Sequence, residues 1–209
     1  KSTIADLELL RARGLSDEIV ALAKAGLPVI GICGGYQMLG ETIRDPEHVE
    51  SSQGEVPGLD LLPVTTTFQL AKSTHQVKGF VAHGQGLLGK AAGLPVTGYE
   101  IHMGQSLGGP APSPFAIQER SRHPSAEGQD ADGCYGMDVN VFGTYIHGLF
   151  HNQELRRAIL SELAARKGVA LGPWGKVVSK EDEYDRLAAH FRSSLDMDLI
   201  YRSLGAAQS

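Results

Sequence analysis

Apolar residues recur at helical spacing near both ends of the chain and once in between, which predicts amphipathic helices in these stretches. Ser16 is a candidate N-cap for the second helix, and Gly26 is its candidate stop. Asn152 is a candidate N-cap nearer the carboxyl end, and Asp45-Pro46 would halt the helix of the middle region. The predicted helices cover residues 4–12, 17–25, 35–43, 153–166 and 180–204.

The middle of the chain has the patterning of strands. Residues 28–32 form a short apolar run, which predicts a buried strand. Residues 104–114 are rich in Gly, Pro and Ser, and residues 120–132 are polar, so both predict loops that could border a substrate. Further strands are predicted at 64–68, 75–82, 96–103, 115–119, 133–139 and 140–146, the last two as a hairpin.

This order of elements predicts an α/β fold in which helices flank a sheet. We expect residues 1–170 to form one domain and residues 171–209 to be a helical extension of that domain. Only helices are predicted before residue 27, although a buried strand needs neighbours in a parallel sheet. We therefore expect the domain to be truncated at its amino end, with one or more strands upstream of Lys1.

Composition narrows the class of protein. The 209 residues are 42% hydrophobic and 21% charged, as in ordinary globular proteins. A net charge of −5 without any basic run does not favour a nucleic acid or a membrane as partner. Cys33 and Cys134 are the only cysteines, which argues against a disulfide scaffold and a paired-cysteine zinc site. Without a visible signal peptide, we expect a cytoplasmic domain that holds no metal.

Cys33 is the strongest candidate for chemistry. It follows the buried strand, has Gly31 before it and Gly34-Gly35 directly after it, and precedes a helix. A strand, a nucleophile flanked by glycines and a helix are the parts of a nucleophile elbow. The start of a helix favours the thiolate form of a cysteine. The alternative is a small cysteine that merely packs at the end of a core strand.

A cysteine nucleophile needs a base, and the chain has eight histidines. His147 ends a strand-like run and is followed by Gly148, at the kind of strand end where active sites form on open α/β sheets. His102 is the second candidate, since it shares a strand face with Glu100. Structural roles are the alternatives for both histidines, and we interpret Cys134 as structural.

The remaining site candidates surround Cys33. The backbone N–H of Gly34 is the natural first donor to an oxyanion. Gln37, one helical turn after Cys33, either points its amide into the same pocket or is an exposed helix residue. We expect Gly34, Gly35, Tyr36, Gln37 and His102 to bind the substrate or the oxyanion.

Residues 31–37 (GICGGYQ) resemble the nucleophile motif of class I glutamine amidotransferases, G-x-C-x-G-x-Q. Common members of that family carry an H-x-E signature, whereas here Leu149 stands in the place of the glutamate after His147. In this respect the chain resembles the cobyric-acid-synthase-like subfamily, which works with a Cys/His pair and lacks that glutamate. The stretches that share this resemblance are residues 1–7, 34–40, 45–46, 49–51, 58–63, 98–104 and 142–150.

The resemblance covers at least residues 1–165 and implies a flavodoxin-like sheet with Cys33 at the elbow. It implies glutamine hydrolysis through a thioester, with the ammonia passing to an amino-terminal synthetase domain that amidates corrinoid carboxylates in cobalamin biosynthesis. ATP and Mg²⁺ would belong to that domain and no cofactor to this one, since the chain has no G-x-x-x-x-G-K-[ST] loop. A Pro-Gly-Ser segment, which the family has just upstream of the position of Lys1, would supply the second oxyanion donor.

Other functions are open on the sequence alone. The domain could be the glutaminase of a cobyrinate a,c-diamide synthase or of a peptidoglycan-precursor amidotransferase. It could also be a docking module that keeps the fold without turnover, for which the leucine at position 149 and the expected truncation at the amino end are the arguments.

Overall fold

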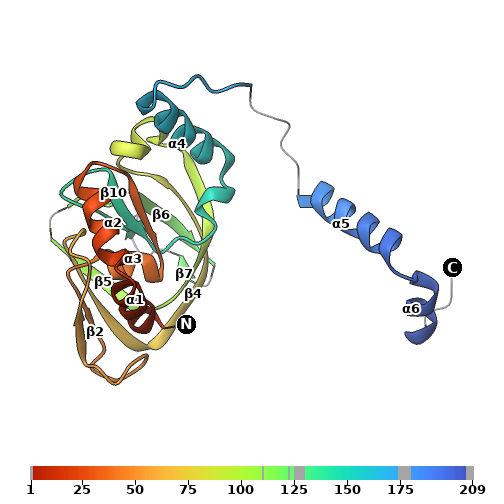
Figure 1. Cartoon of the computed structure of the whole chain (residues 1–209), viewed down its shortest axis with the longest axis horizontal. Helices are drawn as coiled ribbons and strands as arrows, with labels where there is room; N and C mark the ends of the chain where they lie inside the picture. Colours follow the sequence, from red (N-terminus) through yellow and green to blue (C-terminus); the bar gives the residue numbers. More distant parts are fainter. Residues whose placement is uncertain (1, 110, 122, 125–129, 174–179, 206–209) are drawn as a thin grey trace. The chain divides into compact units, whose positions relative to one another are not determined.

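A computed structural model describes residues 2–109, 111–121, 123–124, 130–173 and 180–205. The chain divides into two compact units, Lys1–Ala170 and Leu171–Ser209 (Figure 1). That residues 171–209 extend the same domain stays a prediction.

The first unit contains four α-helices among its described residues, and three of them match the predicted spans closely. These are α1 (Thr3–Ala12), α2 (Leu15–Lys24) and α4 (Gln153–Arg166). The fourth, α3 (Gly34–Leu39), is shorter than predicted because the chain turns at Gly40 and enters a strand. Two short 3₁₀ helices, η1 (Gly86–Ala91) and η2 (Leu149–His151), complete the set.

The two predicted N-caps are wrong in detail. Ser16 lies inside α2 and is buried, and Gly14 in the left-handed conformation precedes that helix. Asn152 does stand at the start of α4, but its side chain makes no capping bond there. It bonds instead to the backbone N–H and carbonyl of Thr97, at 2.9 Å each, and so ties α4 to a distant strand.

The smaller sheet has three strands in the order β1 (Val29–Ile32), β10 (Val141–Thr144), β9 (Cys134–Tyr135). β1 runs parallel to β10, with Ile32 opposite Thr144. β9 and β10 are antiparallel, which confirms the predicted hairpin in shortened form. Among the described residues β10 is the only strand paired with β1.

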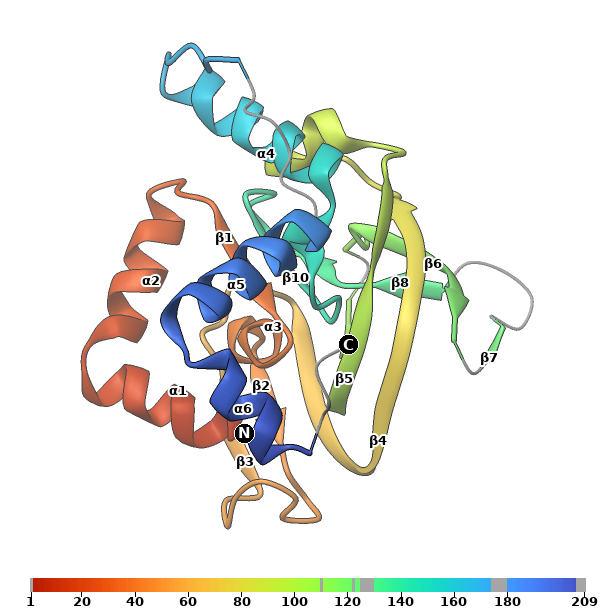
Figure 2. The same ribbon diagram turned by 90° about the vertical axis from the view of Figure 1, so that its right-hand side faces the viewer.

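The larger sheet has seven strands of mixed direction and is built on a long antiparallel pair. This pair, β4 (Val64–Val81) and β5 (Pro95–Gly108), is visible as two long curved arrows in Figure 2. The predicted strands 64–68 and 75–82 are thus one strand, and the predicted loop 104–114 starts later, because β5 continues to Gly108. The other strands are β2 (Thr42–Arg44), β3 (Glu55–Pro57), β6 (Phe115–Arg120), β7 (His123–Pro124) and β8 (Asp130–Asp132).

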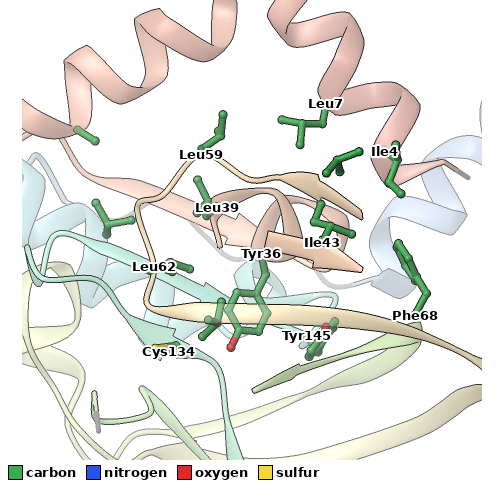
Figure 3. Close-up of a cluster of buried hydrophobic side chains, with 14 residues drawn as sticks. Ile4, Leu7, Tyr36, Leu39, Ile43, Leu59, Leu62, Phe68, Cys134 and Tyr145 are labelled. Atoms are coloured by element: carbon green, nitrogen blue, oxygen red, sulfur yellow. The ribbon is translucent and has the colours of Figure 1, made fainter. Parts of the chain in front are cut away.

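Two clusters of buried side chains form the core of this unit. One lies around α3 and includes Leu7, Leu39 and Ile43 (Figure 3). The other includes Phe115, Phe142 and Leu155 and joins α4 and η1 to the sheets. An α/β fold with flanking helices is therefore confirmed.

The second unit contains α5 (Lys180–Ser194) and α6 (Met197–Ser203). The sequence predicts one helix over residues 180–204, but the chain breaks at Leu195 and Asp196. The carboxylate of Asp196 accepts a hydrogen bond from the backbone N–H of Leu199 and caps the second helix.

Candidate active site

Cys33 occupies a strained turn between β1 and α3. Its φ and ψ angles are 53° and −111°, a conformation that residues with a side chain rarely adopt. Such strain persists only where the surroundings enforce it, and it concentrates at functional sites. A Cβ at Gly31 would lie 2.8 Å from the backbone of Tyr36, so glycine there is what allows α3 to fold back onto β1. The elbow geometry predicted for Cys33 is confirmed.

A cavity of about 200 Å³ opens beside Cys33. Backbone and side chains at the amino ends of α1 and α3 line it, together with residues from β4 and β5. Of the predicted site residues, Cys33, Gly34, Gly35, Gln37 and His102 line this cavity. Its size and its position at the elbow suit a small polar substrate.

His147 reaches the same end of the small sheet as Cys33. Cys33 directly follows β1, and His147 lies three residues beyond the end of the parallel neighbour β10. The backbone N–H of Cys33 donates to the carbonyl of Thr144 at 2.9 Å, which locks the two strand ends together. His147 is not among the residues that line the cavity.

Strand β5 contacts both residues. The Sγ atom of Cys33 lies 3.5 Å from the carbonyl oxygen of Ile101. Tyr99 and His147 exchange two backbone hydrogen bonds, 2.8 Å from the N–H of His147 and 3.2 Å from the N–H of Tyr99. Tyr99 and Ile101 are two residues apart, about 6–7 Å along a strand. One strand therefore positions the predicted nucleophile and the predicted base.

His102 has a different environment. Its ring stacks on that of Tyr145 with a centroid separation of 3.9 Å, and its Nδ1 lies 2.7 Å from the carbonyl oxygen of Gly104. Burial lowers the pKa of His102, and nearby Arg120 and His147 act in the same direction, while the Gly104 carbonyl and Glu100 act against it. A neutral His102 whose Nδ1–H donates to Gly104 keeps Nε2 as an acceptor.

Gln37 is buried, and its side-chain amide is engaged on both ends. Its Oε1 accepts a hydrogen bond from the hydroxyl of Thr3 at 3.0 Å, and its Nε2 donates to the hydroxyl of Tyr145 at 3.3 Å. The hydroxyl of Tyr145 is in turn hydrogen-bonded to the hydroxyl of Ser106, at 2.7 Å. Gln37 lines the cavity, and the hydrogen bonds of its amide join α1, α3 and the segment after β10.

Tyr36 does not lie beside the cavity. It is a core residue that packs edge-on against Tyr145 with ring centroids 5.1 Å apart, and burial raises the pKa of its hydroxyl strongly (Figure 3). The predicted role of Tyr36 in substrate binding does not fit this placement. The sequence misled here because the first turn of a helix has both an exposed and a buried face, and Tyr36 lies on the buried one.

A buried carboxyl group anchors the chain between β10 and His147. Asp132 accepts hydrogen bonds from the hydroxyl of Thr144 and, at 3.1 Å, from the backbone N–H of Tyr145. Burial raises the pKa of Asp132 to about 6, and the charge of Glu100 adds to that, although the two hydrogen bonds oppose it. The sequence placed residue 132 at the end of a loop and gave no sign of this role.

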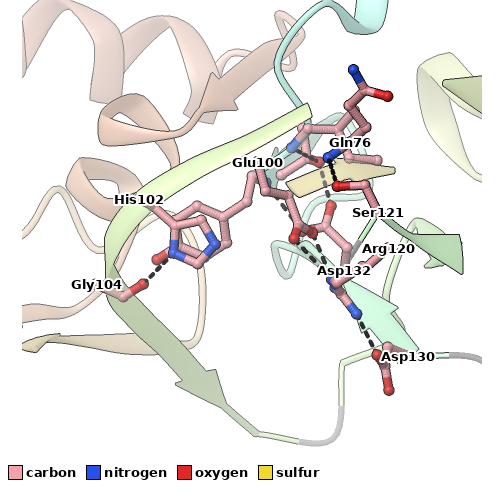
Figure 4. Close-up of polar contacts among 11 residues, drawn as sticks. Gln76, Glu100, His102, Gly104, Arg120, Ser121, Asp130 and Asp132 are labelled. Carbon is pink, nitrogen blue, oxygen red and sulfur yellow. Dashed lines mark hydrogen bonds and ion pairs between the residues drawn. The ribbon is translucent and has the colours of Figure 1, made fainter. Parts of the chain in front are cut away.

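A second polar cluster ties β5 to β6. Arg120 donates to both carboxylate oxygens of Glu100, at 2.9 and 3.0 Å, and also pairs with Asp130 (Figure 4). Glu100 is almost fully buried, so this bidentate pair satisfies a charge that would otherwise be costly. The predicted neighbourhood of Glu100 and His102 on one strand is present, but Glu100 is bound to Arg120.

Cys134 is buried in β9, where it packs in the cluster around α3. Burial raises the pKa of its thiol, which makes it a poor nucleophile. Within the described ranges, no group of three or more His, Cys, Asp and Glu side chains is arranged to hold a metal ion. No helix in the described part of the chain is long and apolar enough to cross a membrane.

Comparison with known proteins identifies the family of this domain. Residues 1–155 match the model of the CobB/CobQ-like glutamine amidotransferase domain. A cobyric acid synthase from Moorella thermoacetica is 43% identical over 211 residues, and one from Alkaliphilus metalliredigens is 43% identical over 209 residues. Each match covers 98% of this chain.

The chain spans 40–41% of the length of these two curated relatives. Among solved structures, PurLQS from Thermotoga maritima aligns with a TM-score of 0.49 and 16% identity, over 71% of this chain and 68% of that one.

Proposed function

Because the chain belongs to the CobB/CobQ-like glutamine amidotransferase family, we propose that it hydrolyses glutamine at Cys33 and releases ammonia for an amidation reaction. The observation that carries this proposal is the strained position of Cys33 between β1 and α3, with a cavity beside it. The cysteine is thereby held at the turn rather than packed as an ordinary core thiol.

In the first half of the reaction, the thiolate of Cys33 attacks the side-chain carbonyl carbon of glutamine. In this proposal the backbone N–H of Gly34, directly after the nucleophile, donates to the oxygen on which negative charge develops. The imidazolium of His147 protonates the amide nitrogen as the C–N bond breaks. Ammonia leaves, and a γ-glutamyl thioester joins the substrate to Cys33.

In the second half, neutral His147 takes a proton from water, and the hydroxide attacks the thioester carbon. The C–S bond breaks, glutamate leaves, and the Cys33 thiolate and the His147 imidazolium are restored. The same two side chains serve both halves, so no further proton carrier is needed.

His102 is the alternative base, because it lines the cavity with Cys33 and His147 does not. Burial favours its neutral form, as a base requires. We favour His147 for the proton transfers because it lies three residues beyond β10, and β10 is the direct neighbour of the strand that ends just before Cys33. In this account His102 forms a polar wall of the substrate site.

Release of ammonia from glutamine, measured at steady state, tests these assignments. Cys33→Ala and His147→Ala should each lower kcat by at least about 10³-fold. His102→Ala should mainly raise KM. Cys134→Ala is the matched control for a buried thiol and should keep its turnover. Full activity of the Cys33→Ala variant would refute the proposed function, and an inactive His102→Ala beside an active His147→Ala would exchange the roles of the two histidines.

The curated relatives support a more specific proposal, that the ammonia serves a cobyric acid synthase in cobalamin biosynthesis. In the longer protein, a synthetase domain would use ATP and Mg²⁺ to activate corrinoid carboxylates. His147→Ala in that protein should abolish amidation driven by glutamine and leave amidation driven by free ammonia largely intact. Equal loss of both would give His147 a structural role or a role in the synthetase reaction.

A further inference from the structure

A catalytic imidazole needs a third group that fixes its orientation. The position two residues after His147, where common class I glutamine amidotransferases carry a glutamate, holds Leu149, which is buried in a core cluster. Glu100 lies on the strand that contacts His147, but both of its oxygens are bound by Arg120. Neither position supplies a carboxylate to the imidazole.

The side chain that does face the imidazole belongs to Tyr99. The two rings stack almost in parallel, with an interplanar angle of 9° and a centroid separation of 5.0 Å. Stacking of this kind restricts rotation of a ring about its χ2 bond without requiring a hydrogen bond. The Nε2 atom of His147 is buried and has no hydrogen-bond partner among the residues that the structure describes. Within the described part of the chain, no hydrogen bond fixes the orientation of that nitrogen.

The main chain of Tyr99 holds the main chain of His147 as well. The two residues form an isolated antiparallel bridge outside the regular strands, with the hydrogen bonds of 2.8 and 3.2 Å in both directions. Gly98 makes this approach feasible. A Cβ at that position would lie 2.6 Å from Cγ2 of Ile146 and would overlap the carbonyl oxygen of His147.

We propose that Tyr99 is the positioning residue for His147, and that ring stacking together with the backbone bridge replaces the orienting carboxylate. This inference rests on the proposed function, with His147 as the base. Tyr99 does not line the cavity beside Cys33, so its effect on the reaction passes through the imidazole.

Kinetics of two Tyr99 variants test the proposal. Tyr99→Phe keeps the ring and should retain turnover within about 3-fold. Tyr99→Leu removes the aromatic plane and should lower kcat by about 10- to 100-fold at nearly unchanged KM, because it misorients the base without touching the substrate. Tyr99 is 43% exposed, so loss of its ring opens no sealed core. If the leucine variant folds poorly, Tyr99→Thr repeats the test, because threonine favours strands and has no ring.

The pH dependence of Cys33 alkylation provides a readout that a purely structural role would not move. In the wild type, iodoacetamide should react with Cys33 at about pH 6, below the ordinary thiol pKa of about 8.5, since an oriented imidazolium stabilises the thiolate. Tyr99→Leu should lose this reactivity at low pH, and Tyr99→Phe should keep it. Tyr184→Leu, the same change at an exposed position of α5, is the matched control.

The outcomes separate the two levels of inference. A Tyr99→Leu variant with wild-type kcat and wild-type alkylation at about pH 6 overturns the positioning role while the proposed function stands. Parallel losses in Tyr99→Phe and Tyr99→Leu also overturn it, because the hydroxyl rather than the ring would then matter. If the wild-type protein neither hydrolyses glutamine nor is alkylated at Cys33 at low pH, the proposed function itself is refuted.

Discussion

Asp132 is a buried carboxyl group that holds the segment between β10 and His147 in place. Because burial raises its pKa from the ordinary 3.8 to about 6, the folded protein binds this proton more tightly than the unfolded chain does. The protonated form of Asp132 therefore stabilises the folded protein. This stabilisation is fully present below about pH 4 and is lost as the pH rises through about 6.

Urea unfolding of Asp132→Asn tests this sign. Between about pH 5 and about pH 8, the free energy of unfolding of the wild type should fall by about 1–1.5 kcal/mol relative to that of the variant. Asp185→Asn, on the separate helix α5, should show no such difference. A wild type that gains stability over Asp132→Asn in this range would contradict the assigned environment of the carboxyl group.

At the level of single residues, the sequence indicated Cys33 and His147 because glycines and strand ends mark such positions locally. It did not indicate Asp132 or Tyr99. Their partners come from other elements, since Asp132 binds the end of β10 and Tyr99 stacks on His147, 48 positions later in the numbering. A single aspartate or tyrosine is not part of a periodic pattern, so the sequence does not indicate which distant residue it contacts.

At the level of elements, Arg120 and Glu100 connect β6 and β5 across the long strand β4. Arg120→Gln would leave the buried Glu100 without its partner and should lower the free energy of unfolding by about 3–5 kcal/mol. The double variant Arg120→Met/Glu100→Met should recover most of that loss, because it removes both charges. Chemical denaturation of the three proteins checks this, and a stable Arg120→Gln single variant would show that the pair is dispensable.

Element types were largely predictable, and their limits were less so. The apolar spacing indicated α1, α2 and α4 almost to the residue. The strand β4 was predicted as two strands because residues 69–74 (QLAKST) do not alternate between apolar and polar side chains. That stretch is mostly exposed to solvent on both faces of the strand, so its residues need not alternate although the strand continues through them. The helix α3 ends early because Gly40 takes an extended conformation, which a helical pattern of side chains does not reveal.

At the level of the whole molecule, the main structural feature is the second edge of β1, with which no described strand pairs. Among the described residues β1 pairs only with β10, and an apolar cavity of about 360 Å³ borders it. A longer chain that adds a strand and a glycine-rich loop at this edge should supply a second oxyanion donor. Such a chain should hydrolyse glutamine about 10²–10³-fold faster than residues 1–209 alone. Equal rates would mean that residues 1–209 already hold the complete oxyanion site.

The division of the strands between two sheets was beyond sequence reasoning. Periodicity shows where strands lie, but the pairing of β1 with β10, more than 100 residues apart, depends on long-range packing. The family resemblance, by contrast, followed directly from the residues around Cys33 and His147, and the match of residues 1–155 to the family model confirms it.

The central claim is that Cys33 is the nucleophile of a glutamine-hydrolysing site, and covalent trapping tests it most directly. A diazoketone analogue of glutamine should alkylate this protein, and peptide mass mapping should place one adduct on Cys33 and none on Cys134. An excess of glutamine should slow the labelling, and His147→Ala should nearly abolish it. Modification of Cys134, or no adduct while iodoacetamide still reaches Cys33, would contradict the account.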